Sequence, residues 1–220
     1  MVCLSIWVSK SLIGDKDIYD LALHHQDVAK SYWKVGFSPR FRVLPEDRDD
    51  NTYRVEDIVK GDELDLPKGT KLKNLFLSCI GDPPCYDDRM ASKDSLRTVH
   101  VFYLNIEQIG ESPTSPIGRT ILYQEQVFII MTKKATDHTF PHEFGHALYF
   151  TNNRLNGNDP ISNKPHNDDP NNLMYEQDST GTMILEQKQL DAKEHSYLTN
   201  PHVLHDTLPP WVGKRNFSIE

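Results

Sequence analysis

The stretch "HEFGHALYFTN", residues 142–152, constrains the fold more than any other part of the sequence. Residues four apart lie on the same face of a helix, one turn from each other. His142 and His146 can therefore point their ring nitrogens at one metal ion, with the carboxylate of Glu143 beside it. The apolar residues of this stretch face the other way and are expected to pack into the core: Phe144, Ala147 and Leu148. The stretch predicts a helix with one metal-binding face and one core face.

The pattern His-Glu-x-x-His is typical of catalytic zinc sites, in which three protein ligands hold the zinc and a water takes the fourth position. Zinc lowers the pKa of that water toward about 7. Glu143 is then the expected general base, which takes a proton from the water and carries it to the leaving amine. The pattern predicts Zn²⁺ as cofactor, but His142 and His146 supply only two of the three ligands.

A third histidine does not stand at the most common position. The usual short extension of this motif has a Gly three residues after the second His and another His six residues after it, where this chain has Tyr149 and Asn152. Further on, residues 166–175 read "HNDDPNNLMY". This segment resembles the third ligand and Met-turn of the metzincin zinc peptidases, above all of their matrixin branch. His166 and Met174 lie eight residues apart, which is the spacing of that branch.

The resemblance implies that His166 is the third zinc ligand, displaced by a 14-residue insertion, residues 152–165. An imidazole is also a better zinc ligand than the amide of Asn152. Met174 is implied to form the Met-turn, a structural floor beneath the metal and not a ligand. The insertion is polar, so it is predicted to lie on the surface, at the rim of the cleft. Three nearby carboxylates remain alternative oxygen ligands: Asp159, Asp168 and Asp169.

The patterning predicts an α+β fold with a mixed sheet. Strands are expected over 2–8, 39–45 and 98–104, with a strand pair within 119–131. Helices are expected from Asp15 or Asp17 to about Val35, from about Asp137 to Phe150, and from about Met183 to Leu198, and Gly36 is expected to end the first. Within residues 46–97, only Leu72–Ser78 suggests a further element. The resemblance implies a metzincin-like twisted sheet, an active-site helix, a Met-turn and a C-terminal helix.

The whole chain, residues 1–220, is expected to form one catalytic domain. By the resemblance, an upper subdomain of about 1–151 and a lower subdomain of about 152–220 enclose the site. The 220 residues are enough for a substantial core, and 37% of them are hydrophobic.

Composition and charge limit the kinds of partner that the protein is expected to bind. The net charge of −8 and the lack of a long basic run argue against a nucleic-acid groove. No apolar stretch reaches the roughly 18 residues that a membrane span needs, and residues 1–10 lack the pattern of a signal peptide. We expect a protein or peptide substrate, no nucleic acid and no membrane. The resemblance implies a secreted or exported protein, with the cytoplasm as the alternative.

The remaining candidate residues are expected to be structural. Cys79 and Cys85 can close a small disulfide loop or remain free thiols, and Cys3 is expected to be a small buried residue in its strand. Calcium is compatible with the aspartate clusters, but no segment has the spacing of a known calcium loop. His24 and His25 are expected on the surface of their helix.

Three functions fit these observations. The first is a zinc endopeptidase that pairs an extended peptide with the edge strand within 119–125. The second is a zinc peptidase in which a carboxylate, Glu176 or Asp178, replaces His166. The third is a non-catalytic, toxin-like protein that binds a metal or a partner, and the intact Glu143 speaks against it.

Overall fold

The computed structural model describes residues 1–14, 17–44, 97–109, 116–123, 126–177, 181–200 and 202–203. Along this part of the chain the elements are β1 (Val2–Val8), η1 (Lys10–Leu12), α1 (Ile18–Trp33), β2 (Phe37–Val43), β3 (Thr98–Leu104), β4 (Gly118–Tyr123), β5 (Gln126–Thr132), α3 (Thr139–Phe150), α4 (Gln187–Asp191) and η5 (Ala192–His195). A mixed sheet with helices confirms the predicted α+β class.

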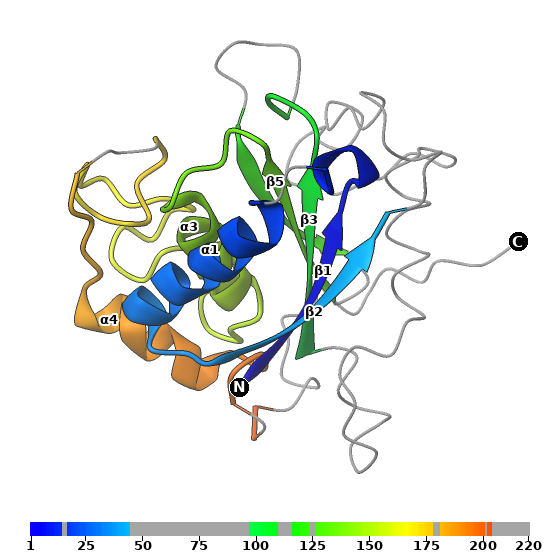
Figure 1. Cartoon of the computed structure of the whole chain (residues 1–220). Helices are drawn as coiled ribbons and strands as arrows, with labels where there is room; N and C mark the ends of the chain where they lie inside the picture. Colours follow the sequence, from blue (N-terminus) through cyan, green and yellow to red (C-terminus); the bar gives the residue numbers. More distant parts are fainter. Residues whose placement is uncertain are drawn as a thin grey trace, which may run out of the picture.

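The described strands form one five-stranded sheet in the order β2-β1-β3-β5-β4. β1 pairs in parallel with β2 and with β3, and β3 pairs in parallel with β5. β4 alone runs antiparallel, beside β5. Figure 1 shows α1 and α3 together on one face of this twisted sheet. β4 therefore ends the described sheet, as the sequence predicted for the strand pair within 119–131.

The two faces of the sheet bury two separate sets of apolar side chains. In β3, Val99 and Val101 belong to the core shared with α1 and α3, whereas Phe102 and Leu104 belong to the core on the opposite face. This alternation follows from the period of two in a strand. Every residue of β3 and β5 is buried, so these central strands are covered on both faces.

Contacts with α1 hold the motif helix α3 in place. The indole Nε1 of Trp33, at the end of α1, donates a hydrogen bond of 2.8 Å to the carbonyl oxygen of Pro141. The ring of Trp33 also meets the ring of Tyr149 edge to face, with 6.1 Å between the centroids. Because Pro141 and Tyr149 bracket the histidines of α3, one buried tryptophan fixes both ends of the motif.

Strand predictions agree closely with the structure, and helix ends agree less well. The strands 2–8 and 98–104 are confirmed to the residue, and the strand predicted at 39–45 spans Phe37–Val43. Gly36 does not end α1, since Lys34 already adopts the left-handed conformation at φ 55° and closes the helix.

The predicted last helix is shorter than expected. Instead of one helix over 183–198, the chain forms α4 and the 3-10 turn η5. Glu186 and Gln189 form a reciprocal capping box at the start of α4. Residues 183–185 therefore lie before the helix, where Ile184 pairs with Asn172 as an isolated bridge.

Some predictions concern residues outside the described ranges. The element at Leu72–Ser78 and the pairing of Cys79 with Cys85 are among them. Cys3 lies in β1 as predicted, but it is only partly buried and carries a disulfide bond, so the prediction of a small buried apolar residue is wrong.

His25 is buried in α1, contrary to the prediction of a surface histidine. It has no exposed area, and its Nδ1 lies 3.1 Å from the hydroxyl oxygen of Tyr103. Burial lowers the pKa of His25 to about 4, while the charge of Asp137 raises it and that of His24 lowers it. The buried face of α1 therefore includes the polar side chain of His25 in addition to the apolar residues.

We expect the stability of the protein to fall in mild acid because of His25. In the unfolded chain this imidazole titrates near pH ~6.5. Neutral His25 therefore contributes fully above that pH, and the contribution is lost as the pH falls toward the folded value. The shift corresponds to about 3 kcal/mol of unfolding free energy. Urea unfolding of His25→Gln should show a flatter pH dependence than the wild type, whereas the exposed-site control His202→Gln should not. Equal pH dependence in His25→Gln and wild type would contradict this expectation.

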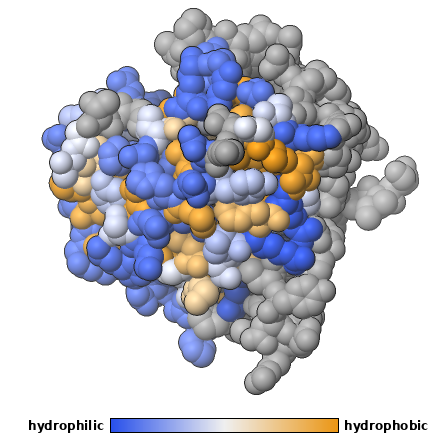
Figure 2. Space-filling model, viewed as in Figure 1, coloured by the Kyte–Doolittle hydropathy of each residue, from blue (hydrophilic) through white to orange (hydrophobic). Residues whose placement is uncertain are grey.

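Among the coloured residues of Figure 2, hydrophilic ones prevail, with hydrophobic patches between them. Large hydrophobic side chains that are exposed in the described residues are Met1, Leu23, Val43 and Ile184. None of the described helices combines the length and the apolar character needed to cross a membrane.

Candidate metal centre

Three imidazoles converge between α3 and the loop that follows it. The Nε2 atom of His146 lies 3.0 Å from Nε2 of His142 and 3.2 Å from Nε2 of His166. Among the described residues these three form a group able to hold a metal ion. A tetrahedral zinc with Zn–N bonds of about 2.0–2.1 Å places its nitrogen ligands about 3.3 Å apart. The histidines predicted as ligands are thus brought together at nearly that spacing.

Hydrogen bonds between the rings do not account for this geometry. A neutral ring nitrogen carries either one hydrogen or one lone pair. Nε2 of His146 can therefore satisfy only one of its two close ring contacts. Three nitrogens that converge in this way fit a cation at their centre, so the donor set suits a metal.

The backbone fixes the tautomer of His142. Its Nδ1 lies 2.8 Å from the carbonyl oxygen of Leu173. A carbonyl can only accept, so Nδ1 is protonated and Nε2 keeps its lone pair. Metal-binding histidines are commonly oriented in this manner through their second nitrogen.

The surroundings of the other two rings favour their neutral form. Burial, followed by the charges of His142 and His166, lowers the pKa of His146 well below its ordinary value. Burial and then His142 also lower the pKa of His166, against an opposing effect of Glu176. Neutral imidazole is the form that binds a metal.

Glu143 directly follows His142 in α3 and is buried. Its side chain is 7% exposed, and the hydroxyl of Thr120 in β4 lies 2.7 Å from its Oε2 and 2.7 Å from its backbone oxygen. Burial raises the pKa of Glu143 to about 7, against the hydrogen bond from Thr120 and the charge of Arg119. A Cβ atom at Gly118 would lie 3.0 Å from Cγ and Oε1 of Glu143, so only glycine lets β4 come this close.

Met174 lies under α3 at the level of the histidines. It has no exposed area, and its amide donates to Oδ1 of Asn172 at 2.9 Å within a tight turn. A Cβ atom at Gly145 would come under 3.0 Å from Sδ of Met174 and from the ring of Trp33. Met174 therefore packs directly against the backbone of the motif helix.

We expect Gly145→Ala to destabilise the protein by about 1–3 kcal/mol or more, because the added methyl group overpacks this contact. Met174→Leu, which is close in volume, should cost on the order of 1 kcal/mol or less and keep the metal affinity of the wild type. Urea unfolding and zinc titration measure the two effects. Loss of metal in folded Met174→Leu would show that Met174 does more than support the helix.

None of the carboxylates near the motif joins the histidine group within the described chain. Asp168 is exposed and pairs with Lys164 at 2.9 Å. Oδ1 of Asp169 accepts the amide of Asn171 at 2.9 Å. Asp159 is buried within the insertion and is bonded to protein groups. Their predicted alternative role as ligands has no support in this geometry.

The side chain of Asn152 has a structural role. Its Nδ2 donates to the carbonyl oxygen of Ala192 at 2.7 Å, and its Oδ1 accepts the amide of Arg154 at 2.8 Å. The first bond ties the chain after α3 to η5, and the second is local, to the residue two positions further on.

Sequence reasoning missed several residues that shape the site. Thr120 and the carbonyl of Leu173 are such residues, since a hydroxyl on an edge strand and a backbone oxygen leave no motif. The alternation of β4 gives a weak signal for Thr120, because it places this side chain on the face toward α3.

No protein-family model and no curated protein matches the chain. Among solved structures, one similar to this chain is a zinc-dependent peptidase from Methanocorpusculum labreanum, with 12% identity and a TM-score of 0.43 over 93% of this chain and 97% of that one. A likeness at this level carries no argument about function, which is derived from the site alone.

Proposed function

We propose that the chain is a zinc-dependent endopeptidase. In this proposal His142, His146 and His166 hold one zinc, and Glu143 is the general base. The observation that carries it is the convergence of three Nε2 atoms, two of them from α3, the helix in which the buried Glu143 directly follows His142. The earlier resemblance to metzincins supports the same assignment, with Met174 as the methionine of the Met-turn.

A bound zinc supplies Lewis-acid chemistry, which polarises the scissile carbonyl and acidifies a water. Glu143 accepts the proton of the attacking water and delivers it to the leaving amine. In the metal-free protein its pKa of about 7 lies close to the pH at which a side chain can both take and release a proton. The hydroxyl of Thr120 holds the carboxylate in one orientation.

The edge strand β4 is the proposed site for the substrate. An extended peptide can add to an exposed strand edge through backbone hydrogen bonds. Thr120 of β4 contacts Glu143, so a peptide on this edge lies within reach of the proposed base. This arrangement supports an endopeptidase, since the peptide can continue beyond the site in both directions.

Zinc content and casein cleavage, measured on the same preparation, test the proposal. We expect one zinc per chain and cleavage that a chelator stops and zinc restores. Bound zinc with no cleavage of casein or of a peptide library would favour a non-catalytic metal protein. A chain that binds no zinc would refute both readings.

A further inference from the structure

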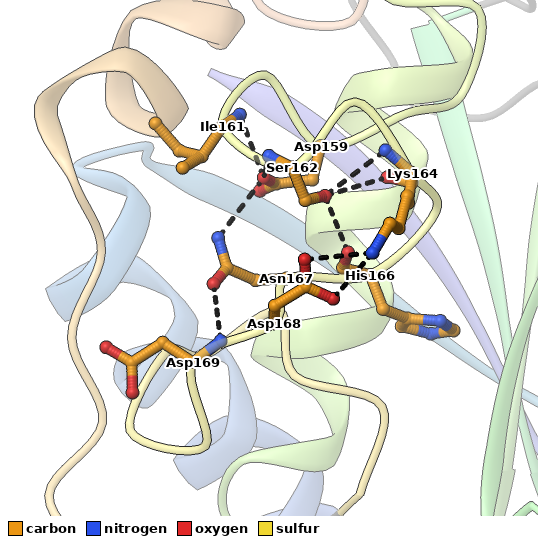
Figure 3. A network of polar contacts seen from close by, with 8 residues as sticks. All are labelled: Asp159, Ile161, Ser162, Lys164, His166, Asn167, Asp168 and Asp169. Carbon is orange, nitrogen blue, oxygen red and sulfur yellow. Dashed lines mark hydrogen bonds and ion pairs between the residues drawn. The ribbon is translucent and has the colours of Figure 1, made fainter.

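The carboxylate of Asp159 is the centre of a buried polar network in the insertion. Asp159 has no exposed area. Its Oδ1 accepts the amides of Ile161 and Ser162, each at 2.9 Å, and the side-chain amide of Asn167 at 3.2 Å. Figure 3 shows these contacts. The first two close a turn inside the insertion, and the third reaches across to the segment that carries His166.

The second oxygen of Asp159 faces the body of the protein. Its Oδ2 accepts the hydroxyl of Tyr149 at 3.2 Å and also accepts Nε2 of Gln189. Burial and the adjacent charge of Asp159 raise the pKa of Tyr149, which keeps the phenol protonated as a donor. Tyr149 lies in α3 and Gln189 in α4, so one carboxylate joins the insertion to both helices.

This network fixes the backbone on both sides of His166. Before it, the hydroxyl of Ser162 donates to the carbonyl oxygen of His166 at 2.6 Å. After it, Asn167 bonds Asp159 through its side chain, and its amide donates to the carbonyl oxygen of Met174 at 2.8 Å. The imidazole of His166 points away from Asp159 in Figure 3. Asp159 therefore holds the main chain of His166 and leaves its ring directed elsewhere.

The same network reaches the turn under the histidines. Gln189 and Asn172 exchange two side-chain hydrogen bonds, of 3.0 and 2.9 Å. Oδ1 of Asn172 also accepts the amide of Met174 at 2.9 Å. Through Gln189, the carboxylate of Asp159 is thus connected to the turn whose Leu173 carbonyl orients His142.

A buried carboxylate is costly unless hydrogen bonds replace its lost hydration. Asp159 has five such bonds, all from groups that hold the insertion, α3, α4 or the His166 segment. An aliphatic side chain could fill the same space without this cost but could not fix the path of the chain. An aspartate at position 159 is therefore better explained by the chain path that its hydrogen bonds fix than by stability alone.

We propose that Asp159 is a positioning residue that sets the metal affinity of the site by holding His166 in place, without touching the metal. This inference rests on the proposed zinc site and deepens it. The 14-residue insertion makes such an anchor necessary, because His166 does not follow α3 directly.

Asp159→Asn tests the proposal with little change in volume. Asparagine keeps one accepting oxygen but turns the other into a donor, which then faces the donors of Gln189 and Tyr149. We expect the zinc affinity to fall by about 10–100-fold, the usual effect of losing an outer partner of a ligand. The absorption spectrum of the cobalt-substituted protein should change as well, since it reports the ligand geometry and not the stability. Competition with a chelating dye measures the affinity.

Asp168→Asn is the matched control. Asp168 lies in the same segment, two residues after His166, but is exposed and pairs with Lys164 on the surface. Its zinc affinity and cobalt spectrum should equal those of the wild type. Folded Asp159→Asn with wild-type affinity and spectrum would overturn the inference, and so would an equal loss in Asp168→Asn.

Tyr149→Phe covers the case in which Asp159→Asn fails to fold. It removes one hydrogen bond to Asp159 and retains the ring that packs on Trp33. We expect a smaller loss of zinc affinity in the same direction, and unchanged affinity would overturn the inference. A wild-type chain that binds no zinc would instead refute the proposed function itself, so the two failures are distinguishable.

Discussion

Glu143→Gln is expected to bind zinc like the wild type and to hydrolyse peptides about 10²–10⁴-fold more slowly. Glutamine has nearly the same shape and can keep the contact with Thr120, which lies 2.7 Å from Oε2 of Glu143. It has no carboxylate to accept the proton of the attacking water. The loss should appear in kcat, with little change in KM, because the proton transfer belongs to the chemical step.

Glu176→Gln is the matched control for this experiment, since it removes an exposed carboxylate near the same site. Its activity should remain close to that of the wild type. Zinc content, thermal unfolding and casein cleavage of both variants can be measured side by side. If Glu143→Gln turned over casein at a nearly normal rate, Glu143 could not be the general base.

Loss of His166 is the second change with a large expected effect. His166→Ala removes one of the three converging ring nitrogens. In the wild type, Nε2 of His166 lies 3.2 Å from Nε2 of His146. Two ligands remain, too few for a stable site. The zinc affinity should therefore fall by more than the ~10–100-fold that loss of an outer partner costs. Dialysis followed by metal analysis, together with a dye competition, measures this loss.

Two controls separate His166 from the other candidate ligands. Asn152→Ala should keep its zinc but lose about 1–3 kcal/mol of stability, because the buried partners of Asn152 remain unsatisfied. Glu176→Gln should also keep its zinc, which a carboxylate ligand at this position would not permit. Equal zinc content in His166→Ala and Asn152→Ala would show that the third ligand has been misassigned.

The sequence by itself determined the elements whose periodicity is strong. The runs at 2–8 and 98–104 predicted both strands to the residue, because short runs rich in apolar, β-branched and aromatic residues fit a buried strand. The spacing of His142 and His146 placed both rings on one face of a helix, since residues four apart always lie so. The core positions Phe144, Ala147 and Leu148 followed from the same period and are all fully buried.

Helix ends and the burial of single polar residues were decided by the tertiary structure. Lys34 ends α1 before Gly36, and Ile184 pairs with Asn172 where a helix was predicted. His25 was expected on the surface but is buried beside Tyr103. For Ile184 and His25, a contact with a distant segment overrides the local preference, which differs between such alternatives by only about 1 kcal/mol.

The convergence of His166 with His142 and His146 also required the fold. Spacing to Met174 pointed to His166, but no local pattern says how a 14-residue detour returns to the helix it left. The structure gives the reason in Asp159 and Tyr149, which bond to each other at 3.2 Å, with Tyr149 at the position where the usual motif has a glycine. A sequence fixes which side chains can bind a metal, whereas the buried hydrogen bonds between distant segments decide which of them meet.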